Sequence, residues 1–121
     1  VPDIQAIEQR TLIELCSMHA LFHLVHLGDD PNPDMETRLD LLVDWHTREL
    51  QPDNAINRPW GVLACIARAV SADEEVSKLN AILHAQTLIS NCCISMGQPD
   101  LLSAFILLDS ANALEAHFAH S

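Results

Sequence analysis

The sequence predicts an all-α protein, a single compact bundle of about five helices that spans residues 1–121 as one domain. Apolar residues recur at helical intervals, as in the stripe that runs through Leu39, Val43 and His46. No alternating run of β-branched residues marks a strand, and hydrophobic residues make up 49% of the chain, which suffices for a core. These observations favour a helical domain and exclude a disordered chain.

Capping residues and prolines delimit the expected helices. Asp34 is expected to cap the second helix, and Pro59 and Pro99 to occupy the first turns of the third and fifth. Ser71 and Glu74 have the spacing of a capping box for the fourth helix. The expected helices cover residues 3–27, 35–50, 59–70, 71–96 and 99–118.

Glycines are expected to end two of these helices. The first helix is bounded by Asp3 as N-cap and by Gly28 after its last turn, and Gly97 follows the fourth helix. Only residues 97–99 separate the fourth helix from the fifth. A connection this short predicts that these two helices are antiparallel neighbours.

The fifth helix is apolar on every side over residues 101–108. The first helix is apolar over most of its circumference in residues 18–27. A helix at the surface of a small protein normally keeps a polar face. A second copy of the chain, in a twofold homodimer, is the commonest cover for such helices. An alternative is that one of them is the central helix of the domain and the other is well wrapped. The residues predicted to bind partners are Leu21, Leu24, Trp45, Phe105 and Leu108.

The charge composition is strongly acidic, with 17 Asp and Glu residues against six Lys and Arg, for a formal net charge of −11. Nucleic-acid binding needs clustered basic residues, and here they are scattered singly, so direct binding to nucleic acid is not expected. The acidity either steers the chain to a protein partner or keeps a hydrophobic small protein soluble.

The cysteines predict a cytoplasmic protein without disulfide bonds. Cys16, Cys65, Cys92 and Cys93 lie within apolar helical patterns, and no Cys-x-x-Cys motif is present. We therefore expect reduced thiols that behave as small core residues. No signal peptide is visible, and the histidines of the first helix argue against a membrane span.

Those histidines form the one constellation that suggests a ligand. His19, His23 and His26 fall within about 60° of one another on the expected first helix. Such spacing can place imidazoles on one zinc or copper ion, and His117 and His120 could complete a site if the fifth helix ends nearby. The stripe also continues the polar face of the helix and lacks a fourth ligand. We therefore expect no metal and no cofactor. If a metal does bind, we expect its ligands to be His19, His23 and His26. A shared response of the three to acid pH is a further hypothesis.

No catalytic signature is present, so we expect a protein that is not an enzyme. The chain has no Gly-rich phosphate loop, no Gly-x-Ser-x-Gly motif and no His-Glu-x-x-His motif. Asp40 and Asp44 share a helix face, as many solvated pairs do. His46 and His84 are expected to be hydrogen-bonded core residues.

The sequence therefore predicts a non-enzymatic, protein-binding regulator of inhibitor or anti-activator type, which occupies a surface of a transcription factor or a similar protein. An immunity or antitoxin protein that inhibits a toxin is an alternative, since both use an apolar helix face and acidic rims. A metal or small-ligand sensor that uses the histidine stripe is an alternative from another class. Trp45, near Arg48, is either an interface anchor or a cover for the core edge, whereas Trp60 is expected in the core.

Overall fold

The computed structural model describes residues 4–27, 32–50, 58–96 and 100–119 of the chain. These residues form five α-helices and no strand, which confirms the predicted all-α fold. The helices are α1 (Ile4–His26), α2 (Pro33–Glu49), α3 (Val62–Ser71), α4 (Glu75–Met96) and α5 (Leu101–Ala119). None of the helices in this part of the chain is long and apolar enough to cross a membrane.

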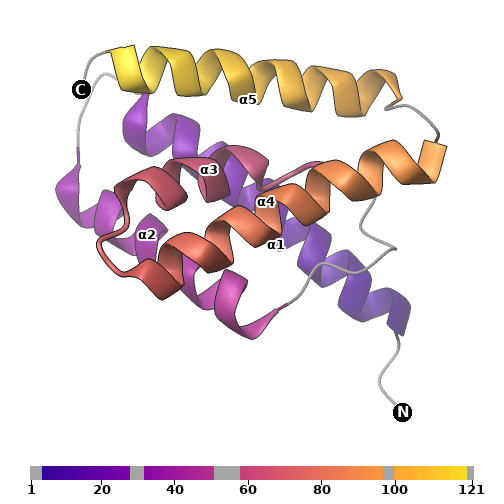
Figure 1. Cartoon of the computed structure of the whole chain (residues 1–121), viewed down its shortest axis with the longest axis horizontal. Coiled ribbons are helices and arrows are strands. Elements are labelled where there is room, and N and C mark those ends of the chain that lie inside the picture. Colours follow the sequence, from indigo (N-terminus) through magenta and orange to yellow (C-terminus); the bar gives the residue numbers. More distant parts are fainter. Residues whose placement is uncertain (1–3, 28–31, 51–57, 97–99, 120–121) are drawn as a thin grey trace.

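The short helix α3 lies at the centre of the arrangement. It packs most extensively against α4, and α2 and α1 lie on the other sides of this pair. The last helix, α5, crosses one edge of the molecule above α1 and α3 (Figure 1). The helices α4 and α5 run in opposite directions and diverge from their shared connection, and α5 packs more extensively on α3 than on α4.

The core is built around one face of α1. Leu15, Met18 and Phe22 are almost completely buried there, and they meet buried side chains of α2, α3 and α4. The turn before α3 comes so close to α1 that Gly61 is required. Its φ of 93° is left-handed, and a Cβ atom at this position would lie 2.6 Å from Cδ2 of Leu15.

The predicted starts of α3 and α2 are wrong. The start of α3 is shifted by this turn, and α2 is capped by a different residue from the one predicted. Pro59 does not begin α3, because the left-handed Gly61 interrupts the backbone and the helix begins at Val62. Asp34 does not cap α2. The side chain of Asn32 accepts hydrogen bonds from the backbone nitrogens of Asp34 and Met35, and Pro33 occupies the first turn.

The starts of the last two helices also differ from the prediction. Ser71 is the last residue of α3 rather than a cap of α4, because the helical hydrogen bonds of α3 continue to Ala72, whose N–H donates to the carbonyl of Arg68. The N-terminus of α5 is capped by Asp100, whose carboxylate accepts a hydrogen bond of 2.7 Å from the backbone of Ser103. The predicted end residues Asp3, Gly28, Gly97 and Pro99 lie outside the described residues.

His46 and His84 are buried in the core, as predicted. His46 is fully buried, with Nδ1 3.2 Å from a carboxylate oxygen of Glu14, and its ring lies 5.8 Å from the ring of His84. Burial lowers the pKa of His46, although Glu14 opposes the shift. Burial and the neighbouring His46 lower the pKa of His84 to about 4. Both rings are therefore neutral at pH 7.

The depressed pKa of His84 predicts acid sensitivity. Below pH 6.5 the unfolded chain binds a proton at this residue that the folded protein does not accept until about pH 4. The free energy of unfolding therefore falls as the pH falls through this window, by about 1 to 2 kcal/mol between pH 7.5 and pH 5. Urea unfolding at the two pH values measures the loss. His84→Gln, which cannot titrate, is expected to reduce it, and an unchanged loss in this variant contradicts the assignment.

Candidate functional site

The fifth helix presents several of its large apolar side chains to solvent, and three of its four buried residues are small. The buried residues of α5 are Ser103, Ile106, Ser110 and Ala113. The outward side carries residues that are between 46% and 75% exposed, namely Leu101, Leu102, Phe105 and Leu108. Small inward residues let the helix lie close to α3, and the outward residues form an uncovered apolar surface that we call the α5 outer face.

The neighbouring helix α4 shows the same pattern. Its buried residues include Ala81, Ala85 and Cys92, which are small, with Leu88 as the one large aliphatic side chain among them. Its exposed residues include Val76, Leu79, Ile82 and Leu83. Monomeric soluble proteins rarely leave contiguous apolar patches of large side chains exposed, and such patches mark interaction surfaces.

A groove of about 890 Å³ lies between α2 and the start of α4. On the α2 side it is lined by Arg38, Leu41, Trp45 and Arg48, whose spacings of three, four and three residues place them on one stripe. Val76 faces them from α4. We call these five residues the groove stripe. Its apolar centre is exposed, since Leu41 is 63% and Trp45 45% accessible to solvent.

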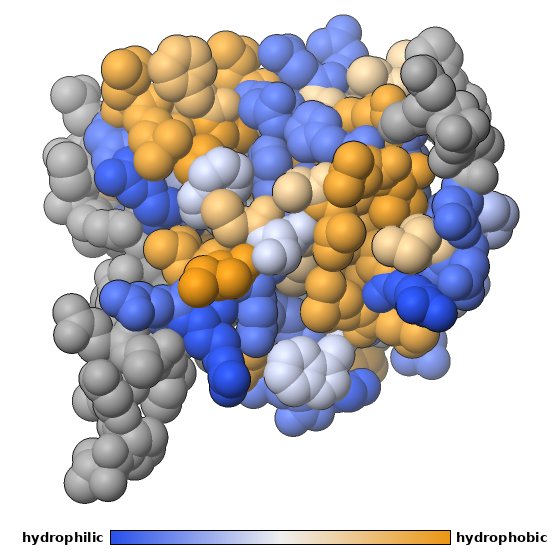
Figure 2. All heavy atoms as spheres, turned by 180° about the vertical axis from the view of Figure 1, so that it is seen from behind, coloured by the Kyte–Doolittle hydropathy of each residue, from blue (hydrophilic) through white to orange (hydrophobic). Residues whose placement is uncertain are grey.

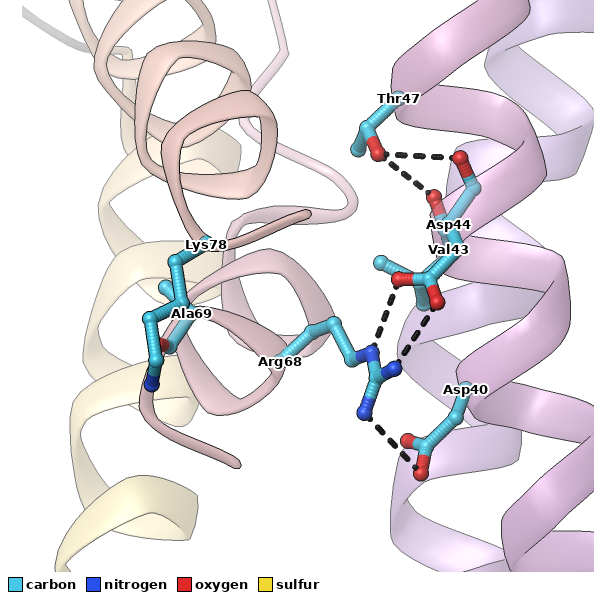
Figure 3. Close-up of polar contacts among 7 residues, drawn as sticks. All are labelled: Asp40, Val43, Asp44, Thr47, Arg68, Ala69 and Lys78. Atoms are coloured by element: carbon cyan, nitrogen blue, oxygen red, sulfur yellow. Dashed lines mark hydrogen bonds and ion pairs between the residues drawn. The ribbon is translucent and has the colours of Figure 1, made fainter. Parts of the chain in front are cut away.

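The floor of the groove is held by a bidentate ion pair. Arg68 of α3 donates two hydrogen bonds of 2.8 Å to the carboxylate of Asp44 on α2, and it lies 3.4 Å from a carboxylate oxygen of Asp40 (Figure 3). These contacts raise the pKa of Arg68, chiefly through the hydrogen bonds to Asp44. Burial raises the pKa of Asp40, and Arg68 opposes that rise.

The ammonium group of Lys78, on α4, binds the C-terminal end of α3. Its Nζ atom donates hydrogen bonds of 3.1 and 3.2 Å to the carbonyls of Ala69 and Val70. A cation at a helix C-terminus is favourable for the helix dipole. The start of α4 is thereby tied to the end of α3, which fixes one wall of the groove.

The charged ends of the groove stripe are held far more loosely. Arg38 pairs with Asp34 at 3.2 Å, and Arg48 with Glu49 at 2.9 Å, and all four side chains are at least half exposed. Exposed pairs of this kind contribute little to stability and are easily exchanged for other partners. Arg38 and Arg48 can therefore pair with carboxylates of a bound protein.

Most of the residues predicted to bind partners are exposed, but they lie on three different elements. Phe105 and Leu108 lie on the α5 outer face, Trp45 lies in the groove stripe, and Leu24 is exposed on α1. Leu21 is half-buried and packs against the core. Seen from behind, apolar residues gather near the beginning of α5 and in the middle of the face, over the region of α1 and α2 (Figure 2).

The structure brings two of the three stripe histidines onto one carboxylate. The Nε2 atoms of His19 and His23 each lie 2.7 Å from Oδ2 of Asp109 on α5. The third, His26, belongs to another cluster, where its ring centre lies 4.6 Å from that of His117 in an edge-to-face contact. His120 lies outside the described residues. Sequence reasoning missed Asp109, although it is the only charged residue between Leu101 and Leu114 and so stands out in an apolar helix.

The electrostatics of this cluster favour an ionised carboxylate between the two rings. Burial raises the pKa of Asp109, but hydrogen bonds from His23 and His19 outweigh it, and the pKa is lowered overall. His19 is 93% buried, since its residual exposure is 7%, and its ring lies edge-on to Trp60 at 5.0 Å. Its Nδ1 atom is buried without a hydrogen-bond partner. Trp60 packs against the core, as predicted.

The four cysteines are free thiols. Cys65 and Cys92 are buried in the core, as expected for small apolar residues. Burial raises the pKa of Cys65 to about 12, so that it remains a thiol at pH 7 and is a poor nucleophile.

Comparison with protein-family models, with curated proteins and with solved structures finds no match in any of the three. The geometry of the chain is therefore the basis for the functional argument.

The ion pair in the groove floor predicts an asymmetric response to mutation. Arg68→Gln leaves Asp40 and Asp44 facing each other without their shared cation, and we expect it to lower the free energy of unfolding by about 1 to 3 kcal/mol. Arg48→Gln is the matched control, since its exposed pair contributes no more than about 0.5 kcal/mol. Urea unfolding of both variants checks this. Equal losses would show that the Arg68 contacts add nothing beyond a surface pair.

Proposed function

We propose that this chain is a non-enzymatic, protein-binding regulator of inhibitor or anti-activator type. The observation that carries the proposal is the packing of α5, which buries two serines, one alanine and Ile106, and exposes three leucines and Phe105. Burying such side chains against a second protein is favourable by about 1.5 to 3 kcal/mol for each one that becomes fully covered. A protein whose surface is arranged in this way is suited to association rather than to catalysis.

The α5 outer face is suited to a second copy of the chain. Leu101, Phe105 and Leu108 follow one another along one side of the helix, so two copies related by a twofold axis can interdigitate them. None of these three residues is charged, and the neighbouring carboxylate of Asp109 is held by His19 and His23 of its own copy. We assign the α5 outer face to a homodimer.

The groove stripe is suited to a different occupant, an amphipathic helix of a target protein. Leu41, Trp45 and Val76 supply an apolar surface for the apolar side of such a helix. Arg38 and Arg48 flank them and select acidic residues at its edges. Tryptophan and arginine are the residue types most enriched among the energetically dominant contacts of interfaces. A regulator of this type inhibits its target by covering a helix that the target uses for its own dimer or docking contact.

The dimer is tested by one charge on the α5 outer face. Phe105→Glu places a carboxylate opposite its own copy in a twofold contact, and we expect it to raise the dimer dissociation constant at least about 30-fold. Ile13→Glu is the matched control, because Ile13 is a similarly exposed apolar residue, 65% accessible, on α1. Sedimentation equilibrium measures both. Dissociation by Ile13→Glu as well, or a wild-type protein that is monomeric at high concentration, contradicts the assignment.

The groove is tested by crosslinking and by a peptide. A photo-crosslinking residue at Leu41 is expected to capture a target protein in the cells of origin, whereas the same residue at the exposed Gln9 of α1 is not. Mass spectrometry then maps the captured segment, which should be an amphipathic helix with acidic flanks. A synthetic peptide of that segment should bind the wild type and lose at least about tenfold in affinity with Trp45→Ala. Equal capture at both positions, or a peptide indifferent to Trp45→Ala, refutes the groove as the binding site.

A further inference from the structure

The cluster of His19, His23 and Asp109 joins two helices that are far apart in the sequence. His19 and His23 are separated by one helical turn on α1, and Asp109 lies near the middle of α5. The two Nε2 atoms and one carboxylate oxygen lie within 4.8 Å of one another. Among the described residues, no other group of three His, Cys, Asp or Glu side chains brings ligand atoms this close together.

The donor chemistry matches that of a divalent transition metal. Histidines four residues apart on one helix face are a recurrent pair of zinc ligands, and a carboxylate from a separate element is a common third ligand. Tetrahedral ligands bound at about 2.0 to 2.1 Å from zinc lie about 3.3 Å from one another. The two distances of 2.7 Å from Nε2 to Oδ2 are shorter than this by about 0.6 Å. Asp109, whose side chain is half exposed, can withdraw by that amount.

The burial of His19 adds an energetic argument. Its ring is held between the helix and Trp60, so it loses little further freedom on binding an ion. Its Nε2 atom already lies 2.7 Å from Oδ2 of Asp109, so the ring need not turn to direct this atom at a shared ion.

We propose that His19, His23 and Asp109 bind one divalent transition-metal ion, with zinc as the representative, between α1 and α5. Three protein ligands leave a fourth position, which the exposed side of Asp109 opens to solvent. The ion fastens α5 to α1 beside the α5 outer face, since Asp109 follows Leu108 and lies one helical turn after Phe105. None of the three ligands is itself a member of the α5 outer face or of the groove stripe, so variants of the site leave both sets of residues unchanged.

Metal titration of tag-free, metal-stripped protein tests the site directly. Calorimetry with zinc is expected to show one ion per chain, and cobalt is expected to give the visible absorption bands of a tetrahedral site. His23→Gln and Asp109→Asn are expected to weaken zinc binding by about 100-fold or more, since each removes one ligand. His26→Gln is the matched control on the same helix and should retain the wild-type affinity.

A second readout keeps the result independent of folding defects. In a Trp45→Phe background, Trp60 is the remaining tryptophan, and cobalt bound beside His19 should quench its fluorescence at the same stoichiometry. Zinc should also raise the melting temperature of the wild type and of His26→Gln, but not of His23→Gln. Unchanged zinc affinity in His23→Gln and Asp109→Asn, loss of binding in His26→Gln alone, or no binding by folded wild-type protein would each overturn the proposal.

Discussion

The arrangement of α5 is the constraint on which the rest of this structure depends. A helix can lie close to a small domain only if the residues between them are small, and Ser103, Ser110 and Ala113 meet that requirement. Ile106 is buried, but several of the other large side chains of the helix are then left at the surface of one copy. The hydroxyl of Ser110 donates to the carbonyl of Ile106 within the same helix, so the close contact leaves no unpaired group there. The exposed leucines and Phe105 follow from this packing.

The polar contacts hold the helices that carry these surfaces. Arg68 binds α3 to α2 through Asp44, Lys78 binds α4 to the end of α3, and Asp109 binds α5 to α1 through two histidines. These contacts connect the helices that carry the surfaces proposed for association, and such preorganisation reduces the entropy lost when a partner binds.

Sequence reasoning predicted the helices better than their ends. The apolar period placed Leu39, Val43 and His46 in the core, where they lie. It misplaced the starts of α2, α3 and α4, because several residues in each loop can cap a helix and tertiary contact chooses among them. The turn at Gly61, for example, packs against Leu15, which is 46 positions earlier in the chain. Asn32 and Asp34 are equally good caps by residue type.

Some residues of the candidate sites could likewise be predicted from the sequence, and others could not. Phe105 and Leu108 could be named from the sequence, because their helix carries more apolar residues than one buried face accommodates. Trp45 could be named because it lies at the flank of the apolar stripe of α2. The partner of His19 and His23 could not, since the choice of Asp109 requires knowing how α5 crosses α1. The separation of His26 from this cluster has the same cause, because its ring contacts Phe22 and His117 instead.

The central claim is that the α5 outer face is covered by a second copy of the chain in solution. Isotope-filtered nuclear Overhauser spectra of a mixture of labelled and unlabelled protein test it most directly. The account predicts contacts between copies from the ring of Phe105 to the methyl groups of Leu101 and Leu108, with the symmetry of a twofold axis. An absence of such contacts, with the tumbling rate of a 13.4 kDa monomer at high concentration, would contradict it.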